Sequence, residues 1–189
     1  MNKQVVYQGK IIEVIQEKVM YGNEERLFES ARRSPGTRLI ILTPNNKLII
    51  TREFRREHNN YDYRLPGGKV FDTLIEYNQA LEKGEDISEK AKLAAAKEAR
   101  EEVGIEAENL ELFTVSKCGV TIDWDLYYFV VNNYKKNQSQ ELETGEDIKV
   151  TEVTPSEAIE ICLDGRMQED RSVAVLLKYF HSQDLINIE

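Results

Sequence analysis

The sequence predicts a mixed α+β fold in which helices cover a mixed β-sheet. Strand patterns fill the first third of the chain of 189 residues, helical patterns begin only after Gly68, and the later strands do not alternate regularly with helices. A doubly wound parallel sheet requires that alternation, so we do not expect one. The length suits one domain, because domains commonly have about 100–200 residues.

Short runs rich in β-branched and aromatic residues, bounded by turn residues, predict the strands. They cover residues 4–8, 11–21, 26–32, 38–43, 47–51, 110–116, 126–132 and 148–153. The turn sequence Pro44-Asn45-Asn46 between two of these runs predicts a hairpin. The polar stretch 132–140 is the segment closest in composition to a flexible linker.

Apolar spacing and end signals predict four helices. The first covers about 72–83 and ends at Gly84. The second, from about 88 to 103, is rich in alanine, begins with the spacing of a capping box and ends at Gly104. The other two cover about 155–164 and 170–182.

The composition excludes several classes of protein. The 25 Lys and Arg residues against 34 Asp and Glu give a net charge of −9, which repels polyphosphate backbones, so we expect no nucleic-acid partner. No run near 18 apolar residues occurs, so we expect no membrane span. The start of the chain lacks the apolar stretch of a secretory signal, and two cysteines are too few for a disulfide framework. We therefore expect a cytoplasmic protein.

Three glutamates share one face of the second predicted helix. Glu98, Glu101 and Glu102 stand at i, i+3 and i+4, which places their Cβ atoms within about 6 Å. Two carboxylates about 4 Å apart repel by roughly 4 kcal/mol at an effective dielectric near 20, so their convergence requires a cation such as Mg²⁺. A solvated acidic face is the alternative. The alanine-rich flank and the upstream pair Gly67-Gly68, with a main-chain carbonyl for the same cation, favour the metal site.

The segment 97–105 resembles the second half of the signature of the Nudix hydrolase superfamily. It reads Lys97-Glu98-Ala99-Arg100-Glu101-Glu102-Val103-Gly104-Ile105 where the family has Arg-Glu-aliphatic-any-Glu-Glu-any-Gly-aliphatic. The run Leu-Pro-Gly-Gly-Lys-Val at 65–70 is similar to the family's loop opening. Residues 69–88 replace a much shorter spacer, so we expect an inserted helix of about 72–84 inside the signature. Either Glu85 or Glu89 then takes the upstream glutamate position.

Other segments are similar to the ADP-ribose pyrophosphatase branch of that superfamily. They are 7–10, 51–55, 145–148, 154–158 and 164–167. The resemblance implies a Nudix fold, with a mixed-sheet α/β/α sandwich over residues 37–189. It also implies N-terminal strands over residues 1–36 that exchange between the subunits of a homodimer.

The resemblance implies hydrolysis of a small-molecule nucleoside diphosphate, with ADP-ribose cleaved to AMP and ribose 5-phosphate. The metal would be Mg²⁺, with Mn²⁺ as the alternative ion. The principal ligands would be Glu98 and Glu102, and the carbonyl of Gly67 would be a main-chain ligand. Glu101 would be either a further ligand or a partner that contacts the ligands from outside. Lys97 stands where the signature has arginine. It keeps the positive charge but lacks the planar guanidinium group that can bind two carboxylates at once.

The resemblance also implies a general base on the polar loop before the strand at 148–153. Glu146 is our choice, and Glu141 and Glu143 are alternatives on the same loop. Arginine side chains are candidates for phosphate or ribose contacts, and an aromatic ring is needed to stack on adenine. The arginine candidates are Arg52, Arg55 and Arg56, with Arg55 as our first choice, and the aromatic candidates are Phe28, Tyr61 and Tyr63.

Two other functions stay open from the sequence. One is Nudix hydrolysis of a sugar nucleotide, a dinucleoside polyphosphate or an oxidised nucleoside triphosphate. The other is a Nudix-fold sensor that binds a nucleotide sugar without cleaving it. The three glutamates argue against the sensor, because a binder does not need clustered carboxylates. Trp124 and Phe180 are predicted to be core or interface residues, and neither cysteine has a nearby histidine that would indicate a nucleophile.

Overall fold

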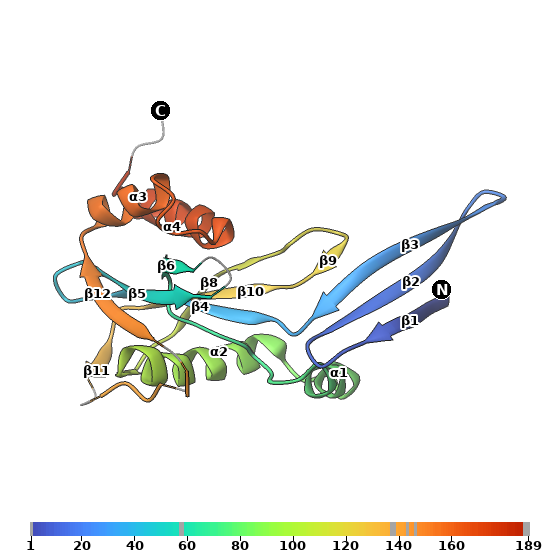
Figure 1. The fold of residues 1–189 in the computed structure, drawn as a ribbon, viewed down its shortest axis with the longest axis horizontal. Coiled ribbons are helices and arrows are strands. Elements are labelled where there is room, and N and C mark those ends of the chain that lie inside the picture. Colours follow the sequence, from blue (N-terminus) through green and yellow to red (C-terminus); the bar gives the residue numbers. More distant parts are fainter. Residues whose placement is uncertain (1, 57–58, 137–138, 143, 146, 187–189) are drawn as a thin grey trace.

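The computed structural model describes residues 2–56, 59–136, 139–142, 144–145 and 147–186 (Figure 1). These residues form a layered body from which a long arm of β-strands extends (Figure 1). None of the helices in the described part of the chain is long and apolar enough to span a bilayer.

A six-stranded mixed sheet forms the centre of the body. Its strand order is β12-β5-β4-β10-β8, and β6 pairs with β5. The strands are β4 (Gly36–Leu42), β5 (Leu48–Arg55), β6 (Asn60–Arg64), β8 (Glu111–Ser116), β10 (Leu126–Val131) and β12 (Ile148–Val153). β4 and β10 are parallel, whereas β4 and β5 form the predicted antiparallel hairpin. The predicted mixed sheet is therefore confirmed.

Helices cover both faces of this sheet (Figure 1). One face carries α2 (Ile87–Glu98), which continues as the π-helical segment η1 (Ala99–Val103). The other face carries α3 (Pro155–Leu163) and α4 (Asp170–Ser182). The three layers confirm the predicted α/β/α sandwich.

The alternation of side chains along β4 builds the two cores. Leu39 belongs to the apolar cluster that includes the buried alanines of α2, whereas Ile40 belongs to the cluster that includes Phe180 of α4. Successive strand residues point to opposite faces, so a strand covered on both faces is apolar throughout. The small side chains at Ala91 and Ala95 let α2 lie close to the sheet. Phe180 is fully buried, as the sequence predicted.

The arm is a separate four-stranded sheet in the order β1-β2-β3-β9. Its strands are β1 (Asn2–Gln8), β2 (Ile12–Tyr21), β3 (Glu24–Arg33) and β9 (Ile122–Asp123). It projects away from the body (Figure 1). Many of its apolar side chains are exposed. They include Val5, Tyr7, Met20, Tyr21, Leu27 and Phe28.

The inserted helix is present as α1 (Leu74–Glu82). A capping box of Thr73 and Glu76 begins it, and Gly84 follows its end with φ +66°. The sequence did not predict the short strands β6, β7 (Ile105–Ala107), β9 and β11 (Tyr134–Lys136). β11 lies inside the stretch with linker-like composition and pairs with β7. Strands this short contain too few residues for an alternating pattern to be read.

Candidate active site

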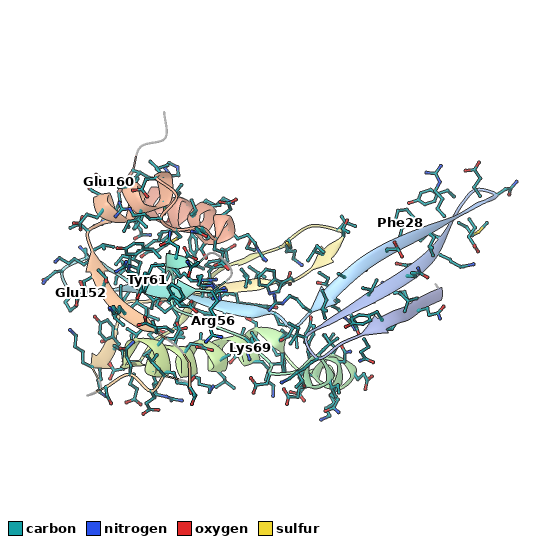
Figure 2. The ribbon with its side chains drawn as sticks, in the orientation of Figure 1. Phe28, Arg56, Tyr61, Lys69, Glu152 and Glu160 are labelled. Atoms are coloured by element: carbon teal, nitrogen blue, oxygen red, sulfur yellow. The ribbon has the colours of Figure 1, made fainter. Side chains whose placement is uncertain are left out.

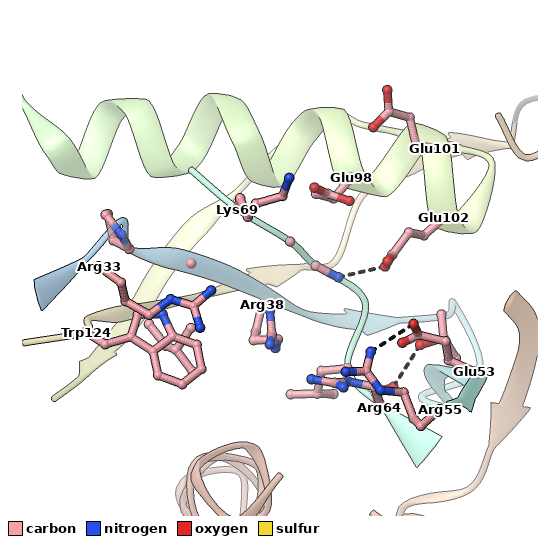
Figure 3. Close-up of a pocket in the computed structure, with 17 residues that line it drawn as sticks. Arg33, Arg38, Glu53, Arg55, Arg64, Lys69, Glu98, Glu101, Glu102 and Trp124 are labelled. Carbon is pink, nitrogen blue, oxygen red and sulfur yellow. Dashed lines mark hydrogen bonds and ion pairs between the residues drawn. The ribbon is translucent and has the colours of Figure 1, made fainter. Parts of the chain in front are cut away.

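A cavity of about 220 Å³ opens between the end of α2, the segment 64–69 and the strands β4 and β5 (Figure 3). Its two sides have opposite charge. The acidic side belongs to α2 and η1 and carries Glu98, Glu101 and Glu102. The basic side chains around it are Arg33, Arg38, Arg55, Arg64 and Lys69. Such a cavity suits a metal-bound anion, because the acidic side attracts the cation and the basic side attracts the anion.

The turn at Gly67 and Gly68, here called the glycine turn, requires glycine at 67 and leaves room for the Glu98 carboxylate at 68. Gly67 has φ +145°, and a Cβ there would overlap the carbonyl oxygen of Thr37. A Cβ on Gly68 would overlap the carboxylate of Glu98. The carbonyl of Gly68 accepts a hydrogen bond from the Thr37 N–H at 2.9 Å, which ties the turn to β4. The absence of side chains therefore lets the helix carboxylates reach the main chain.

Glu98 and Glu102 lie beside the glycine turn, and Glu101 does not (Figure 3). The Gly67 N–H donates to Glu102 Oε2 at 2.7 Å. Glu101 Oε2 is instead 3.0 Å from Lys97 Nζ, and its carboxylate points away from the turn (Figure 3). All three glutamates thus line one cavity, but of the three it is Glu98 and Glu102 that lie against the glycine turn.

The π-helical turn explains this difference. The sequence predicted one α-helix from 88 to 103, but α2 ends at Glu98 and η1 follows it. A π-helix has i→i+5 hydrogen bonds and more residues in each turn than an α-helix. Glu102, four positions after Glu98, therefore returns to the face of the helix that carries Glu98. Glu101, three positions after Glu98, does not. Gly104, with φ +72°, ends the segment as predicted.

The donor atoms fit a hard divalent cation. Two carboxylates and the main chain of the glycine turn line one cavity, and Mg²⁺ usually takes one or two protein carboxylates with waters and substrate oxygens. Within the described ranges, no three His, Cys, Asp or Glu side chains converge as a complete cage. Of the candidates for the upstream position, Glu85 pairs with Lys90 at 2.6 Å and Glu89 is exposed, and neither lines this cavity.

A buried ionic network lies at the basic side of the cavity. Glu169, just before α4, accepts hydrogen bonds from Arg38 Nε at 2.8 Å, Arg38 Nη2 at 2.7 Å and Arg64 Nη2 at 3.3 Å. Ser172 also donates to Glu169, and Tyr128 Oη lies 3.2 Å from the Ser172 hydroxyl. Burial alone would raise the pKa of Glu169, but Arg38, Ser172 and Arg64 together lower it to about 2. Glu169 therefore stays ionised and holds two arginines in place.

Of the predicted substrate-binding residues, the structure brings Arg55 to the cavity. Arg55 Nη1 is 3.0 Å from Glu53 Oε1, and both residues line the cavity with Thr51. Arg52 lies on the other face of β5, because side chains alternate along a strand, and its guanidinium stacks 4.0 Å from the centre of the Tyr61 ring. Arg56 is exposed and does not line the cavity (Figure 2).

Phe28 lies far from the cavity of its own chain. It is near the outer end of the arm, 45% exposed, with its ring 6.1 Å from that of Tyr21 (Figure 2). Glu146 and Glu143 lie outside the described residues. The third candidate base, Glu141, donates its backbone N–H to the carbonyl of Glu101 at 2.9 Å, so the polar loop begins beside η1.

The sequence interpretation missed Arg33 and Trp124. Both line the cavity, and the Arg33 guanidinium carbon is 4.2 Å from the centre of the indole ring (Figure 3). Within the described part of the chain, Arg33 Nε and Trp124 Nε1 are buried without a hydrogen-bond partner. The prediction that Trp124 is a core or interface residue is therefore incomplete. The signal in the sequence was the pair Arg32-Arg33 directly before the turn residues Ser34-Pro35-Gly36.

A family model described as the NUDIX domain matches residues 32–175. The chain belongs to the Nudix family. The match covers the glycine turn, the inserted helix and the three glutamates, and it confirms the resemblance that the segment 97–105 predicted.

Two similar proteins match the chain over nearly its whole length. A methanol dehydrogenase activator of Bacillus methanolicus is 23% identical over 184 residues, which cover 96% of this chain and 91% of the relative. A crystal structure titled as an ADP compounds hydrolase has a TM-score of 0.71 and 18% sequence identity. The match covers 98% of this chain and 95% of that structure. The predicted Nudix fold is thus confirmed.

Proposed function

We propose that this Nudix protein is a divalent-metal-dependent hydrolase that cleaves ADP-ribose to AMP and ribose 5-phosphate. The observation that carries the proposal is the placement of Glu98 and Glu102 against the glycine turn, opposite a basic side of the same cavity. A bound diphosphate needs both features, because a metal ion and guanidinium groups share its negative charge. The solved structure named as an ADP compounds hydrolase supports this substrate class.

The metal would be held by the carboxylates of Glu98 and Glu102 and by the carbonyl of Gly67. Glu101 would be an outer partner, since it pairs with Lys97. Mg²⁺ is the proposed ion, and Mn²⁺ can replace it. When bound, the ion supplies charge neutralisation and a lowered pKa for water.

The residues of the chain then bind and orient the substrate. Arg55 presents a cationic group to the diphosphate across the cavity from the glutamates, and Lys69 presents another beside Glu98 (Figure 3). Glu146 is the proposed general base, with Glu141 and Glu143 as the alternatives on the same loop. A base on this loop is suitable, because the loop starts beside η1 at Glu141.

We also propose a homodimer in which residues 1–36 form the exchanged strands. The exposed apolar side chains of the arm support this, because such surface is usually covered by a partner. Phe28 is too far from its own cavity to stack on a bound base, so it could serve only the cavity of a second copy (Figure 2).

A second candidate function is the activation of another enzyme. It follows from the name of the Bacillus methanolicus relative, which matches nearly the full length of the chain. The two candidates are compatible, because contact with another enzyme through the surface of the protein leaves the cavity free to bind a nucleotide.

A substrate panel tests the proposed hydrolysis. The panel contains ADP-ribose, a sugar nucleotide, a dinucleoside polyphosphate and an oxidised nucleoside triphosphate, each with Mg²⁺ and with EDTA. We expect AMP to appear fastest from ADP-ribose and EDTA to abolish its release. Faster cleavage of another compound would contradict the substrate assignment alone, and no cleavage of any compound would contradict the hydrolase.

A further inference from the structure

The inserted segment, residues 69–86, links three parts of the molecule. It begins directly after the glycine turn, contains α1, and ends where α2 begins. α1 lies where the arm joins the body (Figure 1). Among the residues of the inserted segment, all of which the structure describes, only Lys69 lines the cavity. The segment is therefore not a lid over the site.

The middle of the segment is fixed to the arm by a buried ionic contact. Glu13 is fully buried and lies opposite Arg32 across the paired strands β2 and β3. Arg32 Nε donates to Glu13 Oε1 at 2.7 Å. Asn78 of α1 completes the contact in both directions: its Nδ2 donates to Glu13 Oε2 at 3.3 Å, and its Oδ1 accepts from Arg32 Nη2 at 3.0 Å. A buried ion pair is costly unless its remaining atoms are hydrogen-bonded, and Asn78 provides these bonds.

The backbone of α1 is joined to the arm as well. The Leu74 N–H donates to the carbonyl of Lys10, in the turn between β1 and β2, at 3.0 Å. Leu74 is fully buried, and Ala80, six residues later, is nearly so. The Tyr77 ring packs 5.5 Å from the Phe71 ring, and burial raises the pKa of Tyr77 to about 12. The helix is therefore packed against its surroundings and not loosely attached.

The start of the segment continues a row of hydrogen bonds from the glycine turn. Segment 66–71 runs beside segment 34–39, with bonds from Leu39 N–H to Pro66 O at 2.8 Å and from Val70 N–H to Pro35 O at 3.0 Å. The Ser34 hydroxyl bonds with both the N–H and the carbonyl of Phe71, each at 3.2 Å. Segment 34–39 follows β3 directly, so the arm and the glycine turn are joined through this row.

The end of the segment is fixed to α2. The Glu85 N–H donates to the carbonyl of Ala80 at 2.9 Å, and the Glu85 carboxylate pairs with Lys90 of α2 at 2.6 Å. Asp86 caps α2, because its side chain accepts from the N–H groups of Ser88 and Glu89. The segment is thus held at its start, middle and end.

We propose that the inserted segment holds the arm and the glycine turn in a fixed relation, and that Asn78 is a positioning residue for the metal site. Asn78 acts through Glu13 and Arg32 on the arm, and through segment 34–39 on the glycine turn, against which Glu98 and Glu102 lie. The inference rests on the proposed function for the identity of the site. Its test does not depend on turnover.

The test compares Asn78→Ala with Gln79→Ala, the neighbouring exposed amide of the same helix. Hydrogen–deuterium exchange is measured over segments 34–39 and 66–71, with α4 as the reference. Mn²⁺ binding is measured by electron paramagnetic resonance without substrate. We expect Asn78→Ala to speed exchange in both segments and to weaken Mn²⁺ binding by up to about 10-fold, the smallest loss seen for residues that bond directly to a metal ligand, because Asn78 acts at a greater distance. Gln79→Ala should change neither.

Faster exchange confined to residues 73–83, with unchanged Mn²⁺ affinity, would overturn the proposal, because the helix would then have only a local role. If Asn78→Ala does not fold, Asn78→Ser is judged by the same two measurements, since its hydroxyl keeps a polar group at this position but is too short to bridge Glu13 and Arg32. If the unaltered protein binds no Mn²⁺, the proposed function fails, and the exchange measurement alone decides the role of Asn78.

Discussion

Glu102→Gln should reduce turnover about 100- to 1000-fold while leaving the fold intact. Glutamine has the shape of glutamate, and its carbonyl oxygen can still accept the hydrogen bond from the Gly67 N–H. The substitution removes the negative charge that would hold the cation. A metal ion stabilises the charge of the transition state by several kcal/mol, and losing a few kcal/mol of this stabilisation lowers the rate by about the expected factor.

The measurement is kcat with ADP-ribose at saturating Mg²⁺, with circular dichroism to monitor the fold. The matched control is Glu106→Gln, because Glu106 is exposed on β7, four residues further along the chain. The control should retain normal turnover. Normal turnover in Glu102→Gln as well would show that the metal site has been assigned to the wrong residues.

Glu169→Ala should lower the free energy of unfolding by about 3–5 kcal/mol. It removes the carboxylate that binds Arg38 through two hydrogen bonds, and Arg38 is buried beside the cavity. Loss of one partner of a buried ion pair leaves an uncompensated charge, which accounts for the size of the effect. Urea denaturation measures it, and Glu160→Ala, an exposed glutamate on α3, should change stability by less than about 0.5 kcal/mol. A loss below about 1 kcal/mol in Glu169→Ala would contradict the network.

The same network makes the free energy of unfolding depend on pH in the acidic range. The pKa of Glu169 falls from 4.5 to about 2 on folding, so its contribution is fully present above pH 4.5 and is lost as the pH falls through 2. The shift corresponds to about 3 kcal/mol. The difference in unfolding free energy between the unaltered protein and Glu169→Gln should therefore shrink between pH 5 and pH 2. A constant difference over this range would exclude the ionised carboxylate as its cause.

The acidic side of the cavity could be predicted because it is encoded locally. Glu98 and Glu102 are one helical turn apart, and the glycine turn has a recognisable sequence of its own. The orientation of Glu101 could not be predicted, since the residues of η1 suit an α-helix as well as a π-helix. The switch to i→i+5 hydrogen bonds leaves no mark in the spacing of apolar residues.

The basic side was harder to predict, because sheet topology assembles it. Arg33 ends β3, Arg38 lies in β4 and Arg64 ends β6, and each looks like an ordinary strand arginine in the sequence. The choice between Arg52 and Arg55 depended on which face of β5 turns toward the cavity, and that depends on the exact pairing of the strand. Trp124 follows a two-residue strand whose partner, β3, is remote in sequence.

The position of a bound metal tests the central claim most directly. Crystals soaked in Mn²⁺ give an anomalous signal that locates the ion without reference to activity. We expect a peak about 2.0–2.2 Å from carboxylate oxygens of both Glu98 and Glu102, beside the glycine turn. A peak elsewhere on the protein, or none at this position with saturating Mn²⁺, would contradict the proposed site.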